Sequence, residues 1–91
     1  MKELKSHTIP KGDDFISSYS IKWLWDKNVV FCIKDDNEEL FYQPMKRNDD
    51  VYTIEIDDEV FDAIDKGKYT YSIRIQDKPR TTIGKGSLTI E

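Results

Sequence analysis

Hydrophobic and polar residues alternate along most of the chain with a period of two, which is the pattern of half-buried β-strands. In the segment Gly67–Asp77 (GKYTYSIRIQD), tyrosine and isoleucine occupy every second position, with serine, threonine, arginine and glutamine between them. The alternation predicts a strand whose tyrosine and isoleucine side chains face the core. The same period indicates further strands in Phe15–Trp25, Val29–Lys34, Leu40–Gln43, Val51–Ile56 and Thr82–Ile90.

Short polar segments separate these strands and predict how they connect. The residues DKN after Trp25 indicate a tight turn, so we expect Phe15–Trp25 and Val29–Lys34 to form a hairpin. The acidic run Asp35–Glu39 is typical of a second turn. We expect Pro44–Asp50 to be a loop, because proline cannot donate a hydrogen bond within a sheet.

Two stretches depart from the period of two. In Asp58–Asp65 (DEVFDAID) the apolar residues stand at helical spacing, and Asp58 is suited to cap a single helical turn. In the last strand, the inward-facing parity changes between Ile83 and Leu88. We therefore expect a bulge or kink at Gly84–Gly86.

Short strands joined by turns, with one helical turn, favour an all-β fold over a parallel sheet. We predict an Ig-like antiparallel β-sandwich of six or seven strands that forms one domain over residues 1–91, with residues 1–10 as a flexible N-terminal segment. Gly67 and Tyr69 are placed for a structural corner, in which a tyrosine hydroxyl near the start of a strand hydrogen-bonds to upstream backbone. Folding of so short a chain buries a limited core, so we also expect oligomerisation.

The amino-acid composition argues against several classes of partner and site. The chain has 18 acidic and 14 basic residues, a formal net charge of −4, which argues against nucleic acid as a partner. Cys32 is the single cysteine and His7 the single histidine, so an internal disulfide is excluded and a zinc site lacks ligands. No apolar run is long enough to span a bilayer and no standard secretion signal is visible. We therefore expect the chain to fold and work in a reducing cytosol.

The residues that invite a chemical interpretation each have a simpler one. His7 is expected at the surface or on an edge strand, and Cys32 is expected to pack as a small hydrophobic residue. Asp35–Glu39 resembles a calcium loop in composition but lacks the EF-hand order, so we favour a solvated turn and leave cation binding open. The GKG of Gly84–Gly86 lacks the spacing of a phosphate loop. We therefore predict no catalytic residue, no metal site, no cofactor and no enzymatic activity.

Trp23 and Trp25 are the strongest candidates for a functional surface. They share one face of the strand with Phe15 and Ile21, which favours burial in the core or in a subunit interface. The same two indole rings could instead form a platform for a sugar ring. Core, interface and ligand platform remain three alternatives for these residues.

Three phrases of the sequence resemble a known family. They are KGDDF (Lys11–Phe15), DVYTIEIDDEVFDAIDKGKYTYSIRIQD (Asp50–Asp77) and TIGKGSLTIE (Thr82–Glu91). They are similar to the small Ig-like domain of tailed-phage baseplate and tail proteins, typified by the N-terminal domain of the upper baseplate protein in phages and prophages of Gram-positive bacteria. The chain departs from that pattern where it has DKN in place of an Asp-Gly turn and an Asp-Leu-Thr-Gly-like phrase.

This resemblance implies a structural function. The chain would be a phage or prophage tail or baseplate protein, assembled in the bacterial host cytoplasm and located in the virion tail. Its partners would be other tail proteins or further copies of itself. A carbohydrate- or ligand-binding β-sandwich module that uses Trp23 and Trp25 is the alternative hypothesis.

Overall fold

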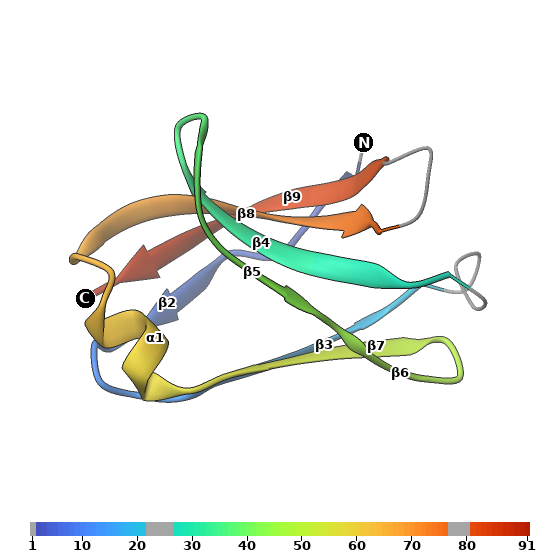
Figure 1. Cartoon of the computed structure of the whole chain (residues 1–91), viewed down its shortest axis with the longest axis horizontal. Coiled ribbons are helices and arrows are strands. Elements are labelled where there is room, and N and C mark those ends of the chain that lie inside the picture. Colours follow the sequence, from blue (N-terminus) through green and yellow to red (C-terminus); the bar gives the residue numbers. More distant parts are fainter. Residues whose placement is uncertain (1, 22–26, 77–80) are drawn as a thin grey trace.

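A computed structural model describes residues 2–21, 27–76 and 81–91, which form two β-sheets packed face to face (Figure 1). Sheet A has the strand order β1-β9-β8-β4-β5, and β2 also pairs with β9. Its strands are β1 (Lys2–Glu3), β2 (His7–Ile9), β9 (Thr82–Ile90), β8 (Gly67–Ile75), β4 (Val29–Asp35) and β5 (Glu38–Pro44). Sheet B has the order β3-β7-β6, with β3 (Phe15–Ser20), β7 (Val51–Ile56) and β6 (Lys46–Asn48).

The predicted all-β sandwich is confirmed, with nine described strands where six or seven were expected. The strand predicted in Gly67–Asp77 is β8 (Gly67–Ile75), which lies in the interior of sheet A between β9 and β4. Part of the surplus comes from the N-terminal residues, which were expected to be flexible. They form β1 and β2, which both run parallel to β9, with Lys2 beside Gly84 and His7 beside Leu88.

The predicted hairpin of Phe15–Trp25 with Val29–Lys34 is wrong. β3 pairs with β7 in sheet B, whereas β4 pairs with β5 and β8 in sheet A. Alternation shows which side chains of a strand are buried but does not show which strand lies beside it. The inward faces of the two strands do meet across the interior, where the rings of Phe15 and Phe31 lie 6.1 Å apart between centroids.

Two connections also differ from the expectation. The segment Pro44–Asp50 was predicted to be a loop, but it contains β6, which pairs with β7. The helical turn occurs as α1 (Asp58–Asp62), yet the capping hydrogen bond does not come from its own first residues. The backbone N–H of Asp58 donates to Oδ1 of Asp14, 2.8 Å away and 44 positions earlier in the chain. Among the described residues, no helix is long and apolar enough to cross a membrane.

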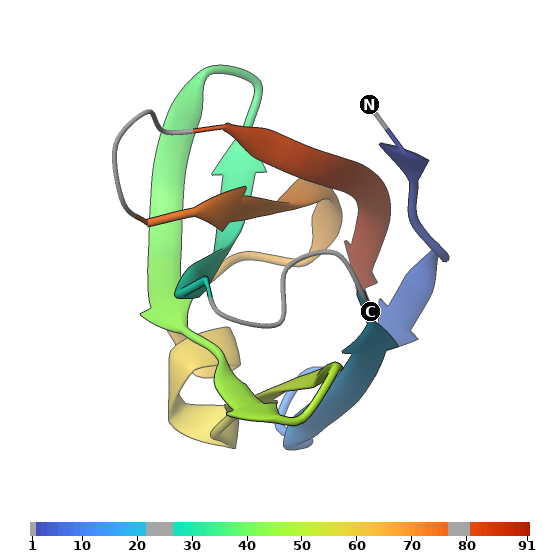
Figure 2. The same ribbon diagram turned by 90° about the vertical axis from the view of Figure 1, so that its right-hand side faces the viewer.

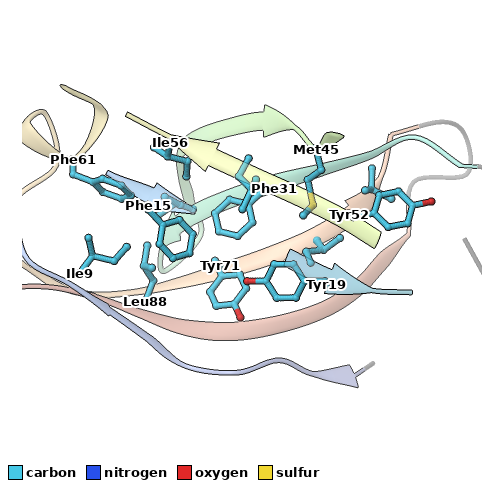
Figure 3. Packing of buried hydrophobic residues seen from close by; sticks show 14 of the residues in the cluster. Ile9, Phe15, Tyr19, Phe31, Met45, Tyr52, Ile56, Phe61, Tyr71 and Leu88 are labelled. Atoms are coloured by element: carbon cyan, nitrogen blue, oxygen red, sulfur yellow. The ribbon is translucent and has the colours of Figure 1, made fainter. Parts of the chain in front are cut away.

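The core between the sheets is built around aromatic rings from both layers (Figure 3). Tyr71 of β8 stacks on Phe31 of β4, with centroids 5.1 Å apart and an interplanar angle of 19°. Phe15 of β3 meets Phe61 of α1 edge to face at 6.3 Å. In antibody domains, an inter-sheet disulfide occupies this part of the core. Here aromatic packing fills the space, since the single cysteine, Cys32, lies on the opposite face of β4 from Phe31.

A bulge in β9 restores the inward parity of its apolar residues. Ile73 pairs with Gly84 and Arg74 with Thr82, so Ile83 is the extra residue. The bulge lies one residue before the predicted Gly84–Gly86 segment. Further along, the Tyr71 ring lies against the backbone of Gly86, where an added Cβ would stand 2.6 Å from a ring carbon.

Candidate functional site

The outer face of sheet A, turned away from sheet B, carries a row of side chains across four neighbouring strands. Register places Lys85 of β9, Ser72 of β8, Cys32 of β4 and Tyr42 of β5 in line. Figure 2, which views the sandwich from one end, shows sheet A curving over sheet B, with β5 (green) descending along one side to reach β6. Tyr42 stands at the end of the row and is 63% exposed. A large, exposed aromatic side chain therefore projects from this face.

A shallow cavity of about 350 Å³ lies beside Tyr42. It is lined by Val30, Glu39, Tyr42, Arg74, Ile75 and Gln76. Nη2 of Arg74 donates to Oε1 of Glu39 at 2.6 Å and to Sγ of Cys32 at 3.0 Å. These contacts hold the guanidinium group between Cys32 of β4 and Glu39 of β5, in the cavity that Tyr42 also lines. We refer to Tyr42, Arg74 and Glu39 together as the outer-face cluster.

Two polar groups are buried beneath this face. Burial raises the pKa of the Cys32 thiol, an effect that the neighbouring Arg74 only partly opposes. The thiol is therefore neutral at pH 7, which agrees with its predicted role as a small hydrophobic residue. Ser72 is 4% exposed, and its hydroxyl has no hydrogen-bond partner among the described residues. A buried hydroxyl without a hydrogen-bond partner costs free energy in the folded domain.

The residues predicted to form a functional surface fall elsewhere. Trp23 and Trp25 lie outside the described residues. Sequence interpretation missed Tyr42, although one signal was present: neighbours in a strand face opposite sides, so either Phe41 or Tyr42 had to point outward. Pairing of Cys32 with Tyr42 decides this, because it places Tyr42 on the outer face and Phe41 against the core.

Gly67 and Tyr69 stand at the start of β8, the strand that follows α1 in the chain. Oη of Tyr69 donates to the backbone carbonyl of Asp65 at 2.6 Å, which is a hydrogen bond to upstream backbone across the turn after α1. Gly67 has a φ of 155°, and an added Cβ would meet only the Tyr69 ring at 3.8 Å. The two residues therefore fix the path of the chain as it leaves the helix and enters β8.

The acidic run Asp35–Glu39 forms the tip of the β4–β5 hairpin. Asp36 has a φ of 54°, and Asp35 pairs with Glu38 across the turn. One of its carboxylates, Glu39, is engaged by Arg74. In the described part of the chain, no three His, Cys, Asp or Glu side chains come close enough together to hold a metal ion.

His7 is an edge-strand residue whose ring turns into the seam between the sheets. Nε2 lies 2.9 Å from Oη of Tyr19 and 3.5 Å from Oγ of Ser17, and the ring meets Phe15 edge to face. Among the described residues, no carboxylate hydrogen-bonds to this ring, as one does in a catalytic triad. The two hydroxyls share one ring nitrogen, so the arrangement connects β2 to β3.

Acidification is expected to weaken the fold through His7. Burial, and then the positive charge of Lys5, lower the pKa of the His7 imidazole below its ordinary value of 6.5. In the window between the folded pKa and 6.5, the unfolded chain binds a proton that the folded chain does not, so the free energy of unfolding falls as pH falls. Melting temperatures should drop further between pH 7 and pH 5 in the wild type than in His7→Gln. Equal drops would show that the carboxylates, present in both proteins, account for the whole effect.

Comparisons with known proteins show the fold. No protein-family model and no curated protein matches the sequence. Among solved structures, the first two domains of DIP-gamma match with a TM-score of 0.62 and 18% identity over 99% of this chain and 46% of that one. A strand-swapped dimer of the Ig-like domain of mouse leukocyte-associated immunoglobulin-like receptor 1 matches with a TM-score of 0.55 and 17% identity, over 94% of this chain and 88% of that one.

A third similar structure is the GBS pullulanase SAP in complex with maltotetraose. It has a TM-score of 0.58 and 22% identity, over 80% of this chain but only 10% of that protein. All three identities are below 25%, so these similarities show the fold and nothing about function. The chain is an Ig-like, two-sheet β-sandwich with little helix.

Proposed function

We propose that this chain is a non-catalytic binding domain that attaches to another protein through the outer face of sheet A. The exposed ring of Tyr42 beside Arg74 carries the proposal. Tyrosine and arginine are enriched at the centres of protein interfaces, where a large ring and a planar donor supply contact area and directed hydrogen bonds. Val30 forms an apolar floor beside them, and Glu39 already orients the guanidinium group.

We further propose that the partner is a component of a phage or prophage tail. This assignment is supported by the phrases KGDDF, Asp50–Asp77 and TIGKGSLTIE, which resemble the Ig-like domain of baseplate proteins. The Ig-like fold suits a role in assembly, because a rigid sandwich presents several faces to neighbours without any chemistry of its own. On this proposal, the chain works in the virion tail and needs no cofactor.

The second candidate function is carbohydrate binding at the same face. Tyr42 provides an aromatic surface, and Glu39, Arg74 and Gln76 surround the cavity of about 350 Å³ with groups that can hydrogen-bond to sugar hydroxyls. The similar pullulanase structure holds maltotetraose, which makes that sugar a suitable probe. This version replaces the predicted platform of Trp23 and Trp25 with one built on β5.

Co-expression with the proteins encoded by the adjacent genes tests the assembly proposal. We expect one of them to copurify with the chain, and Tyr42→Ala and Arg74→Ala to reduce the recovered complex by about tenfold or more, the loss typical of an interface centre. Val51→Ala is the control, since it shortens an exposed apolar side chain on sheet B. Adjacent genes without tail proteins, or a complex unaffected by both variants, would contradict the proposal.

Titration with maltotetraose separates the two candidates. Saturable changes in the amide spectrum around Tyr42, lost in Tyr42→Ala, would favour carbohydrate binding over assembly at this face. An unchanged spectrum, together with a copurifying tail protein, would exclude maltotetraose binding and support assembly as the function of this face.

A further inference from the structure

The sandwich leaves one sheet edge without the usual protection against pairing. Exposed strand edges are normally blunted by charge, proline, a bulge or short length. Three described edges have such features. The edge strand β5 begins with two glutamates, ends in Pro44 and has a bulge in its pairing with β4. The edge strand β6 has only three residues, two of which are Lys46 and Arg47, and β1 and β2 are shorter than four residues each. The remaining edge is β3.

β3 has none of these features. Its sequence is FISSYS, six residues without a charge, a proline or a glycine, and its pairing with β7 runs without a register shift. Its outward-facing side chains Ile16, Ser18 and Ser20 are exposed, and Ile16 is 66% exposed. In Ig-like sandwiches of the constant type, a first strand lies in the sheet beside the strand that corresponds to β3. In this chain, β1 and β2 pair with β9 instead, so no described strand pairs with that edge.

The hydrogen-bonding phase of β3 shows which groups face the free edge. The N–H of Ile21 donates to the carbonyl of Asp50, and the same register continues as Tyr19 with Tyr52 and Ser17 with Ile54. In an antiparallel ladder, every second residue exchanges both hydrogen bonds with one neighbour and the residues between them face the other side. Ile16, Ser18 and Ser20 therefore present their backbone N–H and C=O groups to the free edge.

β2 lies close to this edge but does not use it. Its backbone bonds go to the C-terminal strand, where the N–H of Glu91 donates to the carbonyl of Ile9. Its contact with β3 is made by the His7 ring, which reaches the inward-facing Ser17 and Tyr19. The outward-facing half of β3 remains available for pairing.

We propose that β3 is a self-association edge, which pairs antiparallel with β3 of a second copy about a two-fold axis at Ser18. A second copy of the chain is the favoured occupant. The other described edges are protected, so they are poor partners for β3, whereas the free backbone groups of Ile16, Ser18 and Ser20 can pair with the same groups of a second β3. In this register, Ser18 pairs with Ser18 of the second copy and Ile16 pairs with Ser20, so no charges meet across the axis. About six backbone hydrogen bonds would form, and sheet B would continue as one sheet through both copies.

Cysteine cross-linking tests this register directly. A hydrogen-bonded pair in an antiparallel sheet has Cα atoms about 5.5 Å apart, within the range that a disulfide spans. Ser18→Cys should therefore give a covalent dimer under mild oxidation. Ser87→Cys is the matched control, because Ser87 is also exposed but lies on β9 of sheet A, and it should give no covalent dimer. Cys32 is buried in every variant and supplies a common background.

Introducing like charges at the two-fold axis gives the second measurement. Light scattering over a concentration series should show a reversible dimer of the wild type. Ser18→Lys places two lysines opposite each other and should weaken this dimer by about tenfold or more, whereas Ser87→Lys should leave it unchanged. Circular dichroism checks that each variant is folded.

Three results would overturn the proposal: a wild type that stays monomeric at the highest attainable concentration, no covalent dimer from Ser18→Cys, or equal effects of the two lysine variants. These outcomes are independent of the outer-face cluster on sheet A. A dimer that persists while Tyr42→Ala leaves partner binding intact would contradict only the function proposed for that face.

Discussion

Tyr71→Ala is expected to lower the free energy of unfolding by about 3 to 5 kcal/mol, the usual cost of truncating a fully buried aromatic residue. The Tyr71 ring has no exposed surface, stacks on Phe31 and covers the backbone of Gly86. Its hydroxyl also donates a hydrogen bond to the carbonyl of Lys5, which ties the N-terminal segment to the core. Truncation would open a cavity where the two sheets and the N-terminal strands meet.

Urea denaturation followed by fluorescence or circular dichroism measures this loss. A domain of this size has roughly 5 to 10 kcal/mol of stability in total, so the variant should lose a third or more of it and unfold at a clearly lower urea concentration. Tyr42→Ala is the matched control, since it removes the same side chain from an exposed position of the same sheet and should change stability by less than about 0.5 kcal/mol. Similar losses in the two variants would show that Tyr71 is not the centre of the core.

Gly86→Ala is expected to cost about 1 to 3 kcal/mol, although it adds a single methyl group. The reason is steric, because the new Cβ would lie 2.6 Å from Cε1 and 2.7 Å from Cζ of Tyr71. A phenol ring packed against Phe31 has little room to move, so either the ring or β9 must shift. Ser87→Ala, at the adjacent exposed position of β9, serves as the control and should be nearly neutral.

A double-mutant cycle separates this steric cause from a general preference for glycine. In the background of Tyr71→Leu, which removes the ring but keeps an apolar side chain, Gly86→Ala should lose most of its cost. The measurement is again the free energy of unfolding from urea titration. If the cost of Gly86→Ala stayed the same in both backgrounds, the close contact with Tyr71 would not be its origin.

Local sequence pattern was sufficient for the longer strands, the helical turn and the burial of most of their side chains. Alternation identified β7 and β9 with their correct bounds, and it assigned Tyr52, Ile54 and Ile56 to the core. The change of parity in Thr82–Ile90 revealed a bulge within one residue of its position. These features depend on contacts between a strand and its own two faces, which are encoded by residues close together in the chain.

Pairing and the candidate surfaces depend on partners that are distant in sequence. Whether β3 pairs with β4 or β7, whether Asp14 caps α1, and whether Tyr42 or Phe41 faces outward are each settled by register between distant segments. The same holds for the free edge of β3, which exists because β2 pairs with β9. The sequence by itself therefore determined most of the strands, their inward faces and the all-β class, but not β1, β2 and β6. Only the tertiary structure decided the strand order and which polar and aromatic groups share a surface, because hydrogen bonds across a sheet join residues that no local pattern relates.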